Sequence, residues 1–138
     1  MKDLDLSVFF TRDREEEGVW TDLYAGSEKT GVRIKIIGLN SSSGLASQVE
    51  YSRSLENIKT IKDPVEKAKL MNKAYVEHAA NLVTGLESDD GRKLVIGNKE
   101  FVFNKEAILV VLENRREFAD FVINFANKDR NFTKRNGD

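Results

Sequence analysis

Residues 32–36 have the sequence Val-Arg-Ile-Lys-Ile, which places branched apolar side chains at alternate positions with cations between them. Successive side chains of a β-strand point to opposite faces of a sheet, so this segment predicts a strand with one face buried and the other in solvent. Residues 19–24 alternate in the same way, and Gly26 and Gly31 punctuate the stretch between the two segments. We therefore expect an antiparallel strand pair over residues 17–37.

Helix signals are strongest in the middle of the chain. Asp63 precedes Pro64 and lies three residues before Glu66, which is the pattern of a capping box with proline at the first helical position. Apolar residues then recur at helical spacing as far as Leu82, and Gly85 is expected to end the helix. Altogether, helices are expected over residues 43–60, 64–84, 104–113 and 115–127.

A second, shorter strand pair is expected between the helices. Residues 88–91, Ser-Asp-Asp-Gly, predict a turn ahead of it. Gly97 and Asn98 are a glycine-first pair suited to a tight hairpin turn, and apolar runs at 94–96 and 101–103 flank them. The predicted fold class is α+β and predominantly helical, with an N-terminal antiparallel strand pair, about four helices and this additional short β-hairpin.

The length of 138 residues suits a single domain. We assign residues 1–16 to an N-terminal arm, 17–127 to one globular domain and 128–138 to a flexible C-terminal tail. The tail is polar apart from Phe132. Its apolar surface is too small to offset the entropy lost on ordering, which predicts mobility.

The composition excludes several classes of function. There are no cysteines, which removes disulfides, thiolate catalysis and cysteine-based metal sites. The formal net charge is −1, from 22 basic and 23 acidic residues, and this argues against a nucleic-acid partner. The first residues do not resemble a signal peptide, and the longest apolar stretch, 107–112, is far shorter than the roughly 20 residues that span a bilayer. We expect a cytoplasmic protein without a membrane partner.

Three motifs that suggest chemistry fail its requirements. Gly26 and Gly31 have the spacing of a phosphate-binding loop, but the Lys and Ser or Thr that must follow the second glycine are missing. Residues 89–91, Asp-Asp-Gly, lack the first and last ligands of a calcium loop and are better explained as a turn. His78 is the single histidine and is expected to pack, because no partners for a zinc site or a nucleophile accompany it. We predict no enzymatic activity and no catalytic, cofactor or metal site.

Aromatic residues give the remaining candidates for a functional surface. Phe118, Phe121 and Phe125 recur on one face of the last expected helix, and Phe132 follows in the tail. Core packing is the commoner role of such a stripe, and Trp20 is expected in the core as well. The alternative is a face that docks against a partner, so the four phenylalanines are the candidate partner-binding residues.

The order of several short segments resembles the tail assembly chaperones of long-tailed bacteriophages, over about residues 14–132. The segments that carry the resemblance are Gly18–Leu23, the β-branched strand 32–36, Asn40-Ser41 at a helix start, Ala80–Val83, Asp89–Gly91, Asn104–Ala107, and Arg115–Phe118 with Phe121 and Val122. Each segment is a common local sequence pattern, and the resemblance lies in the order and spacing of the segments.

This resemblance implies a function in the host cytoplasm that needs no chemistry. Such proteins keep the tape measure protein soluble and help to recruit tail tube protein subunits around it. They are commonly made in two forms, the longer by a translational frameshift, which implies an extension branching off within residues 127–138. Self-association into a homo-oligomer is a further possibility that the sequence does not decide. The alternative function is that of a structural tail completion or connector protein that stays in the virion.

Overall fold

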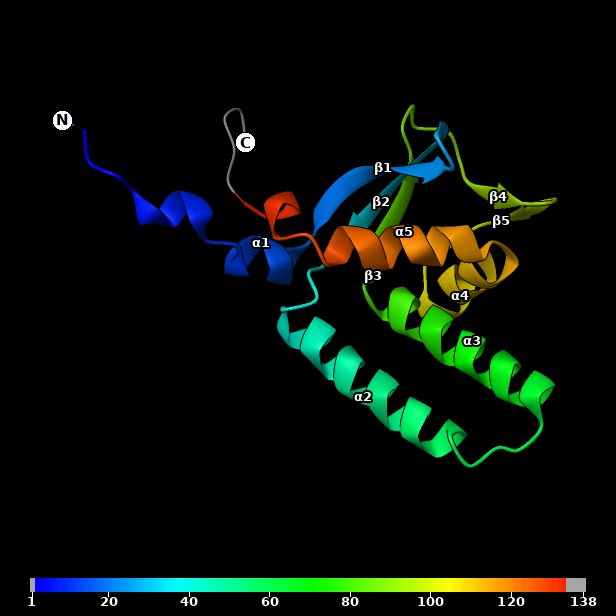
Figure 1. Ribbon diagram of the computed structural model, residues 1–138. Coiled ribbons are helices and arrows are strands. Elements are labelled where there is room, and N and C mark those ends of the chain that lie inside the picture. The colour runs from blue at the N-terminus through cyan, green and yellow to red at the C-terminus, as the bar shows by residue number, and fades with distance from the viewer. Residues whose placement is uncertain (1, 134–138) are drawn as a thin grey trace.

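The computed structural model describes residues 2–133 as an α+β fold dominated by helix, which confirms the predicted class (Figure 1). Its elements in chain order are η1 (Leu6–Phe9), α1 (Arg12–Glu17), β1 (Val19–Ala25), β2 (Glu28–Ile36), α2 (Ser42–Ile58), α3 (Pro64–Asn81), β3 (Val83–Ser88), β4 (Val95–Ile96), β5 (Lys99–Glu100), α4 (Lys105–Asn114), α5 (Arg116–Ala126) and η2 (Asp129–Asn131). The expected N-terminal strand pair, the four long helices and the short hairpin are all present.

The main sheet is antiparallel and has the order β1-β2-β3. The alternation in β2 sorts its side chains as predicted, because Ile34 and Ile36 are fully buried while Arg33 lies on the outer face. There the Arg33 guanidinium pairs with the Glu87 carboxylate of β3 at 3.7 Å. The sheet therefore has one apolar face for the core and one charged face in solvent.

Trp20 belongs to the outer face of the sheet, and its expected place in the core is wrong. It stands opposite Lys35 in the register of β1 and β2, so the two side chains share a face. The guanidinium of Arg33 lies 5.8 Å from the indole centroid. On the other side, the ring covers Gly85 of β3 so closely that a Cβ there would lie 2.7 Å from Trp20 Cη2. Trp20 is half-buried by these neighbours.

The third strand, β3, was not expected. Sequence periodicity predicted helix as far as residue 84 with Gly85 as its end, whereas α3 ends at Asn81 and the chain enters the sheet at Val83. The strand signal is weak because glycine interrupts it, although glycine is what the close approach of Trp20 requires. The expected turn at residues 88–91 follows the strand directly.

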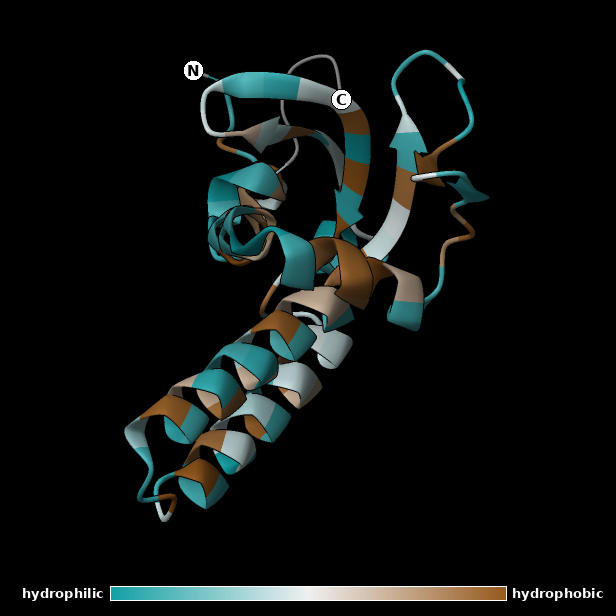
Figure 2. Cartoon of the chain, turned by 90° about the vertical axis from the view of Figure 1, so that its right-hand side faces the viewer, coloured by the Kyte–Doolittle hydropathy of each residue, from teal (hydrophilic) through white to brown (hydrophobic). Residues whose placement is uncertain are grey.

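Helices cover the apolar face of the sheet. α5 packs against β1 and β2, and α3 packs against both α4 and α5 (Figure 1). The largest fully buried apolar side chains lie between these layers and are Ile34, Ile36, Val76, Leu82, Ile108, Leu112 and Val122, joined by Phe132. α2 packs along α3, and Figure 2 shows this antiparallel pair projecting away from the sheet.

Both ends of the domain differ from the boundaries expected from sequence. Glu15 of α1 is buried and its backbone carbonyl accepts a 3.0 Å hydrogen bond from the Gly38 amide. The Glu15 side chain fills the space where a Cβ on Gly38 would lie, so α1 is part of the domain rather than of the arm. The domain therefore begins near residue 11 instead of residue 17.

At the other end, the tail is not free from residue 128 onward. Residues 129–131 form η2, and Phe132 has no exposed surface. The Phe132 ring meets the Phe125 ring edge-on at 5.8 Å between centroids, and Asn131 Nδ2 donates a 2.9 Å hydrogen bond to the Phe125 carbonyl. One large aromatic anchor outweighs the polar composition of its neighbours, because burying a phenyl group is worth about 1.5–3 kcal/mol. Residues 134–138 of the expected tail lie outside the described part of the chain.

Within residues 2–133, no helix has the length and apolar character that crossing a membrane requires.

Candidate functional site

The phenylalanine stripe of α5 serves mainly as internal packing. Phe118, Phe121 and Phe125 are half-buried and pack against the core cluster. A row of ring contacts runs from Tyr24 to Phe121 at 6.2 Å, on to Phe125 at 6.3 Å, and ends at the buried Phe132. Three of these candidate partner-binding residues thus connect the sheet to the C-terminal segment, and Phe132 offers no surface to a partner.

An apolar pocket lies beside the fourth candidate, Phe118. The cavity has a volume of about 140 Å³ and is enclosed by the sheet, the β4–β5 hairpin, α4 and α5. Its apolar lining includes Val32, Leu86, Ile96, Phe101, Val111 and Phe118. Of the four candidate phenylalanines, Phe118 alone lines this pocket. We refer to it as the hairpin pocket.

Thr30 is the one polar side chain that lines the hairpin pocket. Its hydroxyl donates a 2.8 Å hydrogen bond to the Leu23 carbonyl and accepts one from the Val32 amide at 3.1 Å. Because both bonds go to backbone groups, the hydroxyl is satisfied without a ligand. The pocket is therefore suited to an apolar group and offers no polar recognition element to a small metabolite.

The β4–β5 hairpin forms the outer wall of the pocket, and a tight turn at Gly97 connects its two strands. Gly97 has a φ of 62°, and no other residue type among 2–133 has a positive φ, so the glycine-first turn predicted from sequence is confirmed. The Phe101 amide donates a 2.8 Å hydrogen bond to the Leu94 carbonyl and closes the hairpin below the turn. Strands this short gain little from their own pairing, so the hairpin depends on the apolar contacts beneath it.

The hairpin and the segment that follows it also expose apolar side chains to solvent. Val95 and Ile96 are 58% and 46% exposed, and Val102 and Phe103 are also exposed. We call these four residues the apolar rim. Charged residues of both signs surround them in the chain, four cations (Arg92, Lys93, Lys99 and Lys105) and four acids (Asp89, Asp90, Glu100 and Glu106). An exposed apolar group rimmed by charge is typical of a protein-binding surface.

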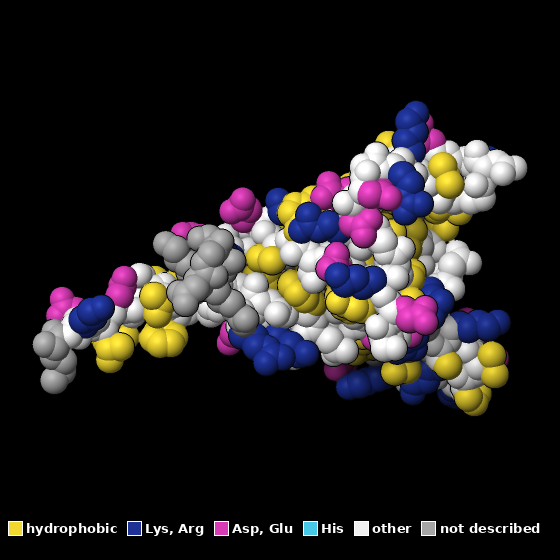
Figure 3. All heavy atoms as spheres, turned by 90° about the horizontal axis from the view of Figure 1, so that it is seen from above, with side chains coloured by type: hydrophobic (Ala, Val, Ile, Leu, Met, Phe, Trp, Pro, Cys, Tyr) yellow, Lys and Arg dark blue, Asp and Glu magenta, His cyan; other side chains and the backbone are white. Residues whose placement is uncertain are grey.

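A second exposed apolar segment lies at the other end of the molecule (Figure 1). Residues 2–10, here called the arm, project from the domain, and Figure 3 shows their hydrophobic side chains standing in the open. Leu4 is 87% exposed, and Phe9 and Phe10 are 66% and 68% exposed. Side chains of this size are rarely left in solvent together unless a partner covers them.

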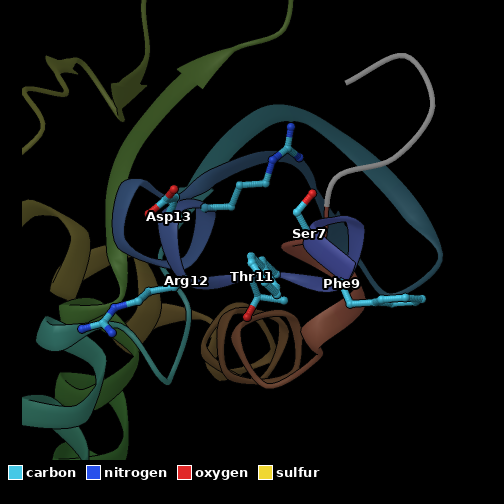
Figure 4. Close-up of a pocket in the computed structure, with 7 residues that line it drawn as sticks. Ser7, Phe9, Thr11, Arg12 and Asp13 are labelled. Atoms are coloured by element: carbon cyan, nitrogen blue, oxygen red, sulfur yellow. The ribbon is translucent and has the colours of Figure 1, made fainter. Parts of the chain in front are cut away.

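The largest cavity lies along the arm but is not a built site. Its volume is about 750 Å³, and among the described residues 2–133 its lining comes from residues 7–14. In Figure 4, Phe9 and Arg12 are directed to opposite sides of this segment instead of converging on a common point. A recess along one continuous segment has no opposing wall to hold a ligand.

The single histidine joins α2 to α3. His78 Nδ1 lies 2.6 Å from Ser47 Oγ, and Asn81 Nδ2 donates to the same oxygen at 3.1 Å. Tyr51 stacks on the imidazole with ring centroids 5.0 Å apart. Ser47 Oγ also lies 3.5 Å from the His78 carbonyl, and the tautomer of the imidazole sets which atom donates between Ser47 Oγ and His78 Nδ1. Burial lowers the pKa of His78, which favours the neutral form of the ring.

This Ser–His contact is packing rather than catalysis. Ser47 and His78 are both buried, and the cavity beside them has a volume of only about 20 Å³, too small for a substrate. The expectation that His78 packs is confirmed.

At the predicted turn, Arg92 donates from Nε and from its amide to Asp90 Oδ1 and holds the pKa of that carboxyl below its usual range.

The strongest candidate is therefore the hairpin pocket with its apolar rim, a surface suited to binding a protein segment. Residues 92–103 carry two short apolar runs around a turn, and that pattern marked the hairpin in the sequence without revealing the pocket.

Within residues 2–133, no three His, Asp or Glu side chains gather where they could hold a metal ion. Comparison of the chain with protein-family models, curated proteins and solved structures gave no match.

Proposed function

We propose that this chain is an assembly chaperone that binds an apolar segment of another protein, and that its client is the tape measure protein of a long-tailed phage. The observation that carries the proposal is the hairpin pocket, an apolar cavity whose outer wall also exposes Val95 and Ile96. The order of segments over residues 14–132 that resembles the tail assembly chaperones supports the choice of client. No chemistry is needed for this activity.

The shape of the pocket fits the client in physical terms. A tape measure protein is a long, apolar, helical ruler that aggregates before the tail tube encloses it. An amphipathic helix presents apolar anchors every three or four residues, and a cavity of about 140 Å³ accepts one such side chain. The cations Lys93 and Lys99 are exposed beside the rim and suit acidic positions on the polar face of the same helix.

The other expected partner, the tail tube protein, needs a surface that the client leaves free. The outer side of α2 exposes Leu45 and Val49, one helical turn apart and remote from the hairpin (Figure 1). We assign the tail tube contact to this side of α2. A chaperone of this kind acts in the host cytoplasm, and a frameshifted longer form would continue beyond the anchored Phe132.

Co-expression with the tape measure protein tests the proposal. The full chain should keep the client in the soluble fraction and co-purify with it. The V95D/I96D variant should lose both effects, because two carboxylates replace apolar side chains that line the pocket and are about half exposed. Val65→Asp is the matched control, since Val65 is 62% exposed on α3 away from the pocket. Equal solubility of the client with and without this chain would overturn the assignment.

The second candidate function is a structural tail completion or connector protein, and the exposed arm favours it. Subunits that remain in an assembly commonly hold their neighbours with projecting segments, and the arm exposes Leu4, Phe9 and Phe10. Mass spectrometry of purified virions separates the two functions. A chaperone is absent from the particle, whereas a connector is present in fixed copy number.

A further inference from the structure

The arm and the hairpin pocket are complementary features of the same chain. The arm exposes large apolar side chains, with two phenylalanines, Phe9 and Phe10, side by side in sequence. The pocket has a volume of about 140 Å³ and an apolar lining. An apolar cavity of about 150 Å³ inside a protein binds a benzene ring. The pocket is therefore the size of one phenylalanine ring.

We propose that residues 4–10 of one copy dock on the hairpin pocket of a second copy, with Phe9 or Phe10 in the cavity. The remaining apolar side chains of the arm then cover the exposed Val95 and Ile96 of the apolar rim. Each copy supplies one arm and one pocket, so exchange between two copies closes a dimer and successive exchange builds a longer array.

Charge supports the same pairing. The arm carries Asp3 and Asp5 beside its apolar residues, with Lys2 as its one cation in the described chain. Beside the pocket, Arg92 is paired with Asp90 at 2.7 Å, while Lys93 and Lys99 are exposed next to the apolar rim. Attraction between the carboxylates of the arm and these two lysines favours the encounter of arm and pocket.

The geometry excludes the arm of the same copy as the occupant. Figure 1 shows the arm leaving the domain at the end remote from β4 and β5. The nine residues 2–10 span at most roughly 30 Å when fully extended. A domain of this length is roughly 35 Å across, and the path around its surface is longer still. The arm that reaches the pocket must therefore come from a second copy of the chain.

The proposal uses the same pocket as the proposed function but does not rest on it, because its test contains no client. Sedimentation velocity of the full chain over a wide concentration range should show self-association. The F9S/F10S variant, which changes only the arm, and the V95D/I96D variant, which changes the rim and the pocket lining but not the arm, should each weaken that association by about tenfold or more. Val65→Asp should associate like the unchanged chain. All five substituted side chains are exposed, and circular dichroism should confirm unchanged folding.

Mixing the two variants gives the decisive result. F9S/F10S retains an intact pocket and V95D/I96D retains an intact arm, so an equimolar mixture should recover one junction and form a heterodimer that neither variant forms alone. A full chain that stays monomeric at every concentration would overturn the proposal. Association that survives both variants, or a mixture that recovers nothing, would overturn it as well, since either result places the contact elsewhere.

Discussion

The hydroxyl of Tyr75 on α3 donates a 2.8 Å hydrogen bond to Oδ1 of Asp120 on α5. The guanidinium of Arg116 lies over the same tyrosine ring, 4.8 Å from its centroid. Burial, together with the hydrogen bond to Asp120, raises the pKa of Tyr75 to about 12. This contact fixes the angle at which α5, and with it one wall of the hairpin pocket, meets α3.

The first prediction concerns that hydrogen bond. Tyr75→Phe should lower the free energy of unfolding by about 1 kcal/mol, because a hydrogen bond to a charged group is worth more than a neutral one but this pair is partly exposed. Since the folded pKa is raised above the usual value of 10, the stabilisation is present below pH 10 and is lost as the pH rises toward 12. Denaturant unfolding at pH 8 and pH 11 should show a smaller pH effect in the variant. An identical pH effect would mean that Tyr75 titrates normally.

The second prediction concerns the buried imidazole. Because the folded pKa of His78 is lowered by burial, its contribution to stability is present above pH 6.5 and is lost as the pH falls below that value. Glu50 and Glu77 line the small cavity beside the ring, and the lowered pKa is caused by burial. His78→Gln should be less stable than the unchanged chain at pH 7.5, with a smaller further loss at pH 5.5. The measurement is denaturant unfolding at both pH values, and an equal loss in both proteins would contradict it.

The third prediction concerns the contact of Trp20 with Gly85. Gly85→Ala should destabilise the fold by about 1–3 kcal/mol, because the added methyl group forces the indole out of its place. The same substitution in a Trp20→Ala background should cost far less, and there alanine is even the better strand residue. A double-mutant cycle by thermal unfolding measures the coupling. Additive costs would show that the indole yields freely.

The fourth prediction concerns the C-terminal anchor. Phe132→Ala should lower the free energy of unfolding by about 3–5 kcal/mol, because the ring is fully buried. Phe9→Ala is the matched control and should change stability by no more than about 0.5 kcal/mol, since that ring is 66% exposed. Denaturant unfolding compares the two. A truncation after residue 127 should be destabilised in the same way, because it also removes the Phe132 ring.

The sequence determined those features that local chemistry controls. At the start of α3, the Asp63 carboxylate accepts a hydrogen bond from the Val65 amide, and Pro64 is the first helical residue. At the start of α4, the Asn104 side chain accepts one from the Ala107 amide. Both helices therefore begin where their capping residues predict. The alternation in residues 32–36 determined which side chains of β2 face the core, because the pleat of a strand has a fixed period of two. Signals of this kind act over a few residues and need no knowledge of the rest of the chain.

Only the tertiary structure decided the features that depend on distant partners. Whether residues 83–88 continue a helix or join a sheet depends on the free edge of β2, some fifty residues earlier in the chain. Trp20 lies outside the core because Lys35 and Gly85 share its face, and Phe132 lies inside because Phe125 offers it a place. The hairpin pocket is formed by the sheet, the hairpin and two helices that meet only in space. Burial is a property of such packed neighbours, so residue type alone could not assign it.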